Sequence, residues 1–175
     1  MKHILPIITI TTLAAAASAQ SAASSGLSYN SVSATYSRTS ITGGPSGITS
    51  YGVSAQALIG SSNVLVSGST TVGGDFGTQD DSASLGYVFK NVQGLADVTV
   101  SVSSNDTFGV NVRKAIGSGF EVAASYSRDN DAEDIYGLAV GYTFNKVYSL
   151  DLGWSHRNQG NNSANTLSAG LRYNF

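Results

Sequence analysis

The chain of 175 residues contains no cysteine, which excludes disulfide bonds, thiolate metal ligands and a cysteine nucleophile. It has only two prolines, charged residues make up just 11% of it, and its net charge is −2. A charge balance this close to neutrality offers no basic surface, so we expect no nucleic-acid partner. The chain is instead rich in glycine (20 residues) and tyrosine (9 residues), with many short runs of Ser, Thr and Val. This composition is typical of an all-β protein.

Long apolar runs are also scarce, and the one at the N-terminus has the features of a signal peptide. Lys2 supplies a positive charge, residues 4–16 form an apolar run, and Ala17-Ser18-Ala19 matches an A-x-A cleavage site. The run is shorter than the ~20 residues that a membrane-spanning helix needs. We therefore expect a cleaved signal peptide over residues 1–19, a short N-terminal periplasmic segment over residues 20–26, and export of the mature chain.

From residue 27 onward, apolar residues alternate with small or polar ones in a series of short segments. Because successive side chains of a β-strand point to opposite faces, this alternation predicts two-faced strands. The last segment, NTLSAGLRYNF, continues the alternation to the final Phe175. The predicted strands cover about residues 27–38, 48–59, 62–73, 81–90, 94–104, 106–116, 119–128, 134–144, 147–157 and 165–175.

The connections between these segments alternate in length. Loops such as TSITGGPSG and GGDFGTQDD follow odd-numbered strands, whereas tight turns such as GS and NK follow even-numbered ones. Short turns on one side and longer loops on the other are typical of an up-and-down barrel in a membrane. We predict an all-β fold, a closed antiparallel transmembrane β-barrel of ten strands over residues 27–175. An eight-stranded barrel is the alternative if the short SND connection is not a reversal.

The two faces of the strands indicate which side meets lipid. One face carries nearly all the large apolar side chains, more than a small barrel can enclose, and the other carries mostly serine, threonine and glycine. The second face is too polar for a hydrophobic core, so we expect it to line the lumen. Aromatic residues six positions apart on the apolar face would lie about 15 Å apart along the membrane normal, near the two interfaces. These pairs are Phe120 and Tyr126, Tyr136 and Tyr142, and Tyr148 and Trp154.

The signal peptide, the alternating strands and the C-terminal LRYNF together resemble the small, porin-like outer-membrane β-barrel proteins of Gram-negative bacteria. The resemblance implies an outer-membrane location, with outer-membrane lipid around the barrel. It also implies that Leu171, Tyr173 and Phe175 are the assembly signal read by the barrel-assembly machinery. It identifies no specific member and implies no particular activity.

Six charged residues fall on the polar face near the short-turn ends of their strands. They are Lys90, Asp97, Arg113, Glu121, Asp151 and Arg172, three of each sign. Arg113 and Glu121 are symmetric about the turn at Gly117, so we expect them to face one another. Asp151 is expected opposite Arg172, and Lys90 beside Asp97, by similar reasoning. The pattern predicts a charge-balanced cluster in the lumen, either a structural plug or a gate in a narrow pore.

The sequence offers little for catalysis. The histidine of the exported region, His156, falls on the lipid-facing side while Ser155 faces the lumen, so the two cannot form a nucleophile–base pair. A lipid deacylase with His156 at the outer rim would need an acidic partner such as Glu133. DNDAED has cation-binding oxygens but lacks the spacing of an EF-hand loop. We expect no enzyme activity, no cofactor and no metal.

The predicted function is therefore passive: a narrow channel for ions or small solutes, or a structural envelope protein. Two alternatives remain open at this stage. One is a surface adhesin or binding barrel that acts through its outer loops, and the other is a soluble secreted β-sandwich.

Overall fold

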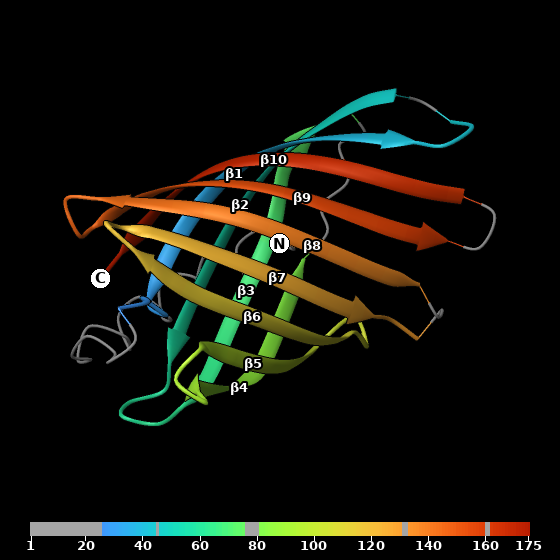
Figure 1. Cartoon of the computed structure of the whole chain (residues 1–175). Coiled ribbons are helices and arrows are strands. Elements are labelled where there is room, and N and C mark those ends of the chain that lie inside the picture. Colours follow the sequence, from blue (N-terminus) through green and yellow to red (C-terminus); the bar gives the residue numbers. More distant parts are fainter. Residues whose placement is uncertain (1–25, 45, 76–80, 131–132, 160–161) are drawn as a thin grey trace, which may run out of the picture.

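The computed structural model describes residues 26–44, 46–75, 81–130, 133–159 and 162–175. The predicted signal peptide and all but the last residue of the predicted periplasmic segment lie outside these ranges. Ten antiparallel strands close into a barrel in which each strand pairs with its sequence neighbours and β10 pairs with β1 (Figure 1). The strands are β1 (Ser31–Ile41), β2 (Ser46–Leu58), β3 (Val64–Gly74), β4 (Ser82–Val92), β5 (Ala96–Ser103), β6 (Phe108–Gly117), β7 (Phe120–Arg128), β8 (Asp134–Phe144), β9 (Tyr148–Gln159) and β10 (Asn162–Asn174).

The prediction of ten strands is confirmed, and both structural alternatives are excluded. The SND connection is a true reversal, because β5 and β6 pair antiparallel and the backbone N–H of Ser103 donates to the Thr107 carbonyl at 2.9 Å. The eight-stranded barrel is therefore wrong. A sandwich has open sheet edges, whereas this sheet closes on itself. One predicted strand start is also wrong: β1 begins at Ser31 rather than at residue 27.

Closure holds the C-terminal strand in place. β10 pairs with β1 from Ser31↔Asn174 to Ile41↔Ala164, and with β9 on its other side. The pairing extends past the strand, because the Phe175 N–H donates to the Asn30 carbonyl at 3.1 Å. No strand in the described part of the chain is left with an unpaired edge, which is the condition for β-structure in hydrocarbon.

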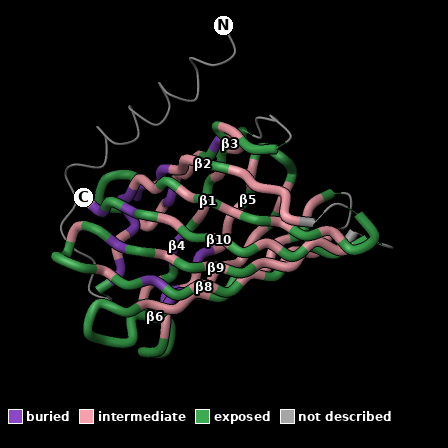
Figure 2. Tube along the Cα trace, turned by 90° about the horizontal axis from the view of Figure 1, so that it is seen from above, coloured by how far each residue is buried: buried purple, intermediate pink, exposed green. Residues whose placement is uncertain are grey.

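The barrel is apolar outside and polar inside, as predicted. Large apolar side chains of the predicted lipid-facing set lie on the exterior, where Leu167 is 64% exposed and Leu138 is 59% exposed. Exposure alternates with shielding along most strands, and Figure 2 shows this alternation around the barrel. An apolar exterior of this extent is unfavourable in water and favourable in lipid. The described residues contain no helix long and apolar enough to cross a membrane.

Cross-strand pairing gathers the exterior aromatic residues at both ends of β7 and β8. The rings of Phe120 and Tyr142 are 4.7 Å apart at one end, and those of Tyr126 and Tyr136 are 5.4 Å apart at the other. The two aromatic residues of each strand are six positions apart, which corresponds to about 15 Å along the membrane normal. The pairing thus forms the two levels that the sequence spacing predicted.

The interior is partly apolar at the short-turn end. A small apolar cluster fills the lumen there, formed by Leu27, Tyr29, Leu58, Leu65 and Val88. Val88 is completely buried, because it points inward between the outward-facing Tyr87 and Phe89. The lumen face was predicted to be too polar for a hydrophobic core, and the structure adds this small apolar cluster at the short-turn end.

Candidate pore and its charged constriction

Paired hydroxyl groups form one wall of the lumen. Four serine pairs join neighbouring strands: Ser33–Ser54 at 2.7 Å, Ser37–Ser50 at 2.6 Å, Ser67–Ser84 at 2.5 Å and Ser69–Ser82 at 2.8 Å between the two oxygens. Each pair uses one hydroxyl hydrogen, so the second hydrogen and several lone pairs remain for a guest. This wall can therefore bond water or a polar solute without favouring either sign of charge.

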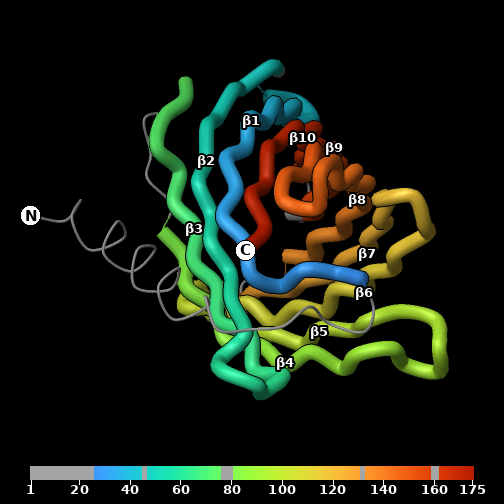
Figure 3. The backbone as a smooth tube through the Cα atoms, turned by 90° about the vertical axis from the view of Figure 1, so that its left-hand side faces the viewer, coloured from blue at the N-terminus to red at the C-terminus, as the bar shows by residue number. Residues whose placement is uncertain are grey.

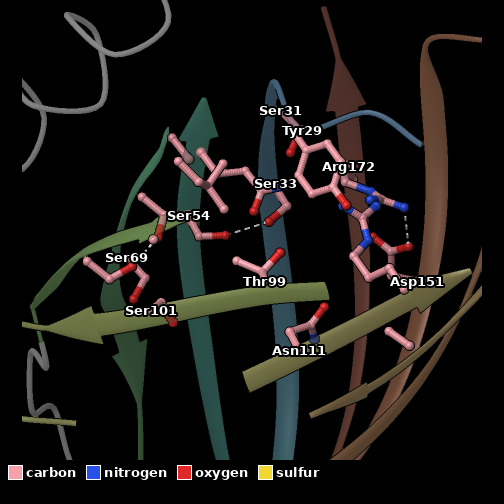
Figure 4. Close-up of a pocket in the computed structure, with 18 of the residues that line it drawn as sticks. Tyr29, Ser31, Ser33, Ser54, Ser69, Thr99, Ser101, Asn111, Asp151 and Arg172 are labelled. Carbon is pink, nitrogen blue, oxygen red and sulfur yellow. Dashed lines mark hydrogen bonds and ion pairs between the residues drawn. The ribbon is translucent and has the colours of Figure 1, made fainter. Parts of the chain in front are cut away.

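A cavity of about 450 Å³ lies between this wall and the charged side chains opposite (Figure 4). Thr99, Ser101 and Asn111 extend its lining, and Tyr29 lies at its short-turn end. A second cavity of about 230 Å³, which shares Ser54 and Ser69, continues the polar lumen. Side chains leave an open, polar interior through much of the barrel.

Four charged residues form a continuous chain of ion pairs along the β6–β10 side of the lumen. The Arg172 Nη2 atom lies 2.7 Å from Glu121 Oε1 and 3.0 Å from Asp151 Oδ1. Glu121 Oε2 lies 3.0 Å from Arg113 Nη2, so this carboxylate joins the two arginines. The set of Asp151, Arg172, Glu121 and Arg113, which we call the ionic cluster, carries two positive and two negative charges. Its charges are largely shielded, and each has a partner, as ions with little access to solvent require.

Gly141 of β8 makes this arrangement possible. The cluster comes from β6, β7, β9 and β10, and it passes over β8 at this glycine. A Cβ atom at position 141 would lie 2.6 Å from Asp151 Oδ1 and 2.8 Å from Glu121 Cγ. Glycine is needed here for close approach, a role that the sequence pattern alone did not identify.

The two predicted ion pairs form, but not by direct pairing across the ladder. Arg113 pairs in register with Ala123, and Glu121 with Ala115, because the turn is formed by Ser118 and Gly119, after the Gly117↔Phe120 pair, rather than centred on Gly117. In β9 and β10, Asp151 pairs with Gly170 rather than with Arg172. Both ion pairs are therefore diagonal. The prediction that these residues directly face one another is wrong, because the turn centres assumed from the sequence differ from those in the structure.

Asp97 pairs in register with Arg113 of the ionic cluster, and hydrogen bonds from outside the cluster also bind it. It is 1% exposed and accepts hydrogen bonds from the Tyr29 hydroxyl at 2.8 Å and the Asn91 N–H at 2.7 Å. The ion pairs among the described residues do not include Lys90, which was expected beside it. Lys90 lies in the interval between Phe89 and Val92, where the β4–β5 ladder shifts. Four of the six predicted charges are thus joined by ion pairs, and Asp97 lies opposite Arg113 at the same end of the lumen.

A segment that sequence reasoning missed crosses this end of the lumen. Residues 26–30, which we call the lumen segment, run from β6 to the start of β1 across the barrel opening (Figure 3). Leu27 and Tyr29 are 4% and 3% exposed. Burial raises the pKa of Tyr29, which keeps its hydroxyl protonated as a donor to Asp97. The sequence does contain one indication of this segment. Leu27 and Tyr29 occupy odd positions, whereas the apolar residues from Val32 onward in the next strand occupy even positions.

The remaining candidates lie at the outer rim. His156 is on the exterior, stacks on Trp154 with ring centroids 6.2 Å apart, and has its Nδ1 atom 3.0 Å from the Asn165 Oδ1 atom. Glu133 pairs with Arg157 at 3.5 Å. In the described part of the chain, no group of three or more acidic or histidine side chains is arranged to hold a metal. DNDAED includes residues 131 and 132, which lie outside the described ranges.

The proposed assembly residues lie together on the exterior of the C-terminal end. Leu171 and Tyr173 are 50% and 44% exposed, and the Tyr173 and Phe175 rings stack with centroids 6.0 Å apart. Recognition of these residues by an assembly machinery stays a prediction.

Solved structures with this fold include outer-membrane barrels. The KdgM porin is 11% identical, with 82% of this chain and 99% of that chain covered and a TM-score of 0.53. The translocator domain of the autotransporter NalP from Neisseria meningitidis is 10% identical, with 99% and 96% covered and a TM-score of 0.51. An S-type phycobiliprotein lyase from Guillardia theta is 5% identical, with 82% and 86% covered and a TM-score of 0.54.

No protein-family model matches the sequence, and no curated protein matches it. The lyase among the similar structures means that barrel shape alone does not identify a function. The apolar exterior and the polar lumen of this chain distinguish a barrel suited to lipid from one suited to water. The resemblance to small outer-membrane β-barrels that the sequence suggested is therefore confirmed at the level of the fold.

Proposed function

We propose that this protein is an outer-membrane barrel that acts as a narrow, porin-like pore for ions or small polar solutes. The observation that carries the proposal is the cavity of about 450 Å³, which is lined by serine and threonine hydroxyl groups and by the ionic cluster. A barrel whose role was only structural would not need an open, polar interior. The export signal expected over residues 1–19 and the apolar exterior support a place in the outer membrane, surrounded by its lipid.

The ionic cluster serves as the constriction of the proposed pore. The chain of four charged residues covers the β6–β10 side of the lumen and lines the cavity of about 450 Å³ opposite the serine wall, so it narrows the path there. Its two positive and two negative charges cancel, and the serine wall is neutral. Such a pore selects by size and polarity more than by sign of charge.

Charge-neutralising variants test the constriction through ion selectivity. Glu121→Gln leaves the cluster with one excess positive charge, and Arg172→Gln leaves one excess negative charge. Single-channel recordings in planar bilayers under a salt gradient should give reversal potentials displaced in opposite directions from the wild type. Glu133→Gln removes the same charge at the outer rim and serves as the control. Equal reversal potentials for Glu121→Gln and Arg172→Gln would contradict a role of the cluster in permeation.

A catalytic role is not part of the proposal. His156 lies beside the Asn165 amide and the Trp154 ring, while the neighbouring Ser155 pairs with Gly137 and Thr166 on the lumen side. Glu133, the acidic partner that a deacylase would need, pairs with Arg157 instead. Incubation with acylated lipids and detection of released fatty acid tests this point, and we expect no release.

A further inference from the structure

We propose that the lumen segment, residues 26–30, is a displaceable plug that closes the short-turn end of the barrel and leaves it when the pore conducts. The inference rests on the proposed pore function and adds its regulation. Figure 3 shows the segment passing across the opening, from the side of β6 to the start of β1.

Contacts hold the segment to strands on different sides of the barrel. Its middle is bound on the β6 side, where the Ser28 carbonyl accepts from Arg113 Nη1 at 3.1 Å and the Tyr29 ring lies 4.9 Å from the Arg113 guanidinium carbon. The Tyr29 hydroxyl reaches Asp97 of β5. At the other end, Asn30 Oδ1 accepts from the Leu58 N–H of β2 at 3.0 Å. The segment is thus fixed across the opening rather than along one wall.

The segment separates two cavities. The lumen cavity of about 450 Å³ is lined by Tyr29 and Glu121. A cavity of about 530 Å³ is lined by Gly26, Leu27, Glu121 and the turns after β6 and β8. Glu121 lines both spaces, so both border the ionic cluster. Movement of the lumen segment would join them into one path.

The way the segment is bound allows it to move without unfolding the barrel. The β1 ladders begin at Ser31, and Asn30 adds one backbone bond beyond them, accepted by its carbonyl from the Phe175 N–H at 3.1 Å. Side-chain contacts, a few hydrogen bonds and the apolar cluster around Leu58 and Val88 hold it. Releasing these contacts leaves all ten strand pairings intact.

Arg113 connects the plug to the constriction. Its Nη1 atom donates to the Ser28 carbonyl and its Nη2 atom binds Glu121. When the segment leaves, this arginine loses both the carbonyl and the Tyr29 ring. The constriction and the plug are therefore expected to rearrange together.

A reversible crosslink tests the plug directly, because the chain contains no cysteine of its own. A Cβ atom at position 26 would lie 4.0 Å from the Cβ atom of Ala115, within the range of about 3.5–4.5 Å found in disulfides. Gly26→Cys combined with Ala115→Cys would tie the segment to β6 when oxidised and release it when reduced. Each single-cysteine variant controls for the effect of its substitution, including strain at the positive φ of position 26.

The crosslink is combined with a variant that loosens the segment. Tyr29→Ala removes the bond to Asp97 and the contact with Arg113, and Tyr29→Phe removes only the former. Tyr36→Ala is the matched control, because Tyr36 lies on the exterior and is 41% exposed. Gel mobility before and after heating verifies that each variant is folded. Mass analysis verifies the disulfide.

In planar bilayers, we expect Tyr29→Ala to raise the open fraction several-fold over the wild type and Tyr36→Ala. Oxidation of the double-cysteine protein should abolish this current, in the wild-type and Tyr29→Ala backgrounds, and reduction should restore it. Undiminished current through the fully crosslinked protein would overturn the plug while leaving the pore intact. Absence of current from the reduced, folded Tyr29→Ala protein would overturn the pore itself, and the plug's regulatory role with it.

Discussion

At the scale of single residues, the ionic cluster depends on its four charged side chains and on the lack of a side chain at Gly141. Asp151, Arg172, Glu121 and Arg113 supply the charges, but they meet because position 141 carries no side chain. Alternation along a strand predicts that these charges face inward. It does not predict which of them touch, because contact across an intervening strand depends on the volume of the residue beneath.

We expect Gly141→Ala to disrupt the cluster. The added methyl group would lie 2.6 Å from Asp151 Oδ1, so the carboxylate and its partner Arg172 must shift. Crowding of this kind costs about 1–3 kcal/mol. The control is Gly52→Ala, whose Cβ atom would meet only the Thr70 carbonyl oxygen at 3.5 Å. Urea unfolding in lipid vesicles measures both, and an equal loss of stability would contradict the role of Gly141.

At the scale of strands, the physical period of β-structure explains both the successes and the failures of prediction. Side chains of a β-strand alternate between its two faces, and the sequence shows this alternation directly. The ten strands and their lipid-facing sides were therefore predictable. The register of strand pairing was not predictable, because it depends on which residues form each turn and on irregularities such as the shift between Phe89 and Val92. Asn91 and Gln93 adopt positive φ values of 52° and 53° there, and the sequence alone does not show that the backbone takes this conformation at either position.

The lumen segment was missed for a related reason. Its alternation is that of a strand, and only its phase differs from β1. An out-of-phase pair such as Leu27 and Tyr29 predicts that the chain turns to the other face. It does not reveal that the chain leaves the wall and crosses the lumen, since that depends on partners from β2, β5 and β6.

The C-terminal strand carries a prediction about assembly. Phe175 stacks on Tyr173 at the exterior and contributes nothing to the lumen lining. If the pair is an assembly signal, Phe175→Ala should slow insertion several-fold in vesicles that contain the barrel-assembly machinery. In vesicles without the machinery, the variant and the wild type should insert at similar rates. An equal delay in both kinds of vesicle would mean that Phe175 acts through stability rather than recognition.

At the scale of the whole molecule, the distribution of polarity is inverted relative to a protein dissolved in water. Leucine, valine and aromatic side chains cover the outside, while serines and compensated charges line the inside. The inversion is consistent with closure of the sheet, because hydrocarbon can satisfy neither a polar side chain nor an unpaired backbone group. The proposed membrane location, the pore and its plug all depend on this sidedness.

Two lysine substitutions test the sidedness. Leu138 lies on the exterior between the two aromatic levels and is 59% exposed, whereas Asn111 lines the lumen cavity. A lysine near the middle of the lipid face costs about 2–4 kcal/mol, so Leu138→Lys should lower the free energy of unfolding in vesicles by that amount. Asn111→Lys adds the same charge to a wet cavity and should cost far less. Circular dichroism during urea titration measures both, and the reverse order would mean that the apolar face does not meet lipid.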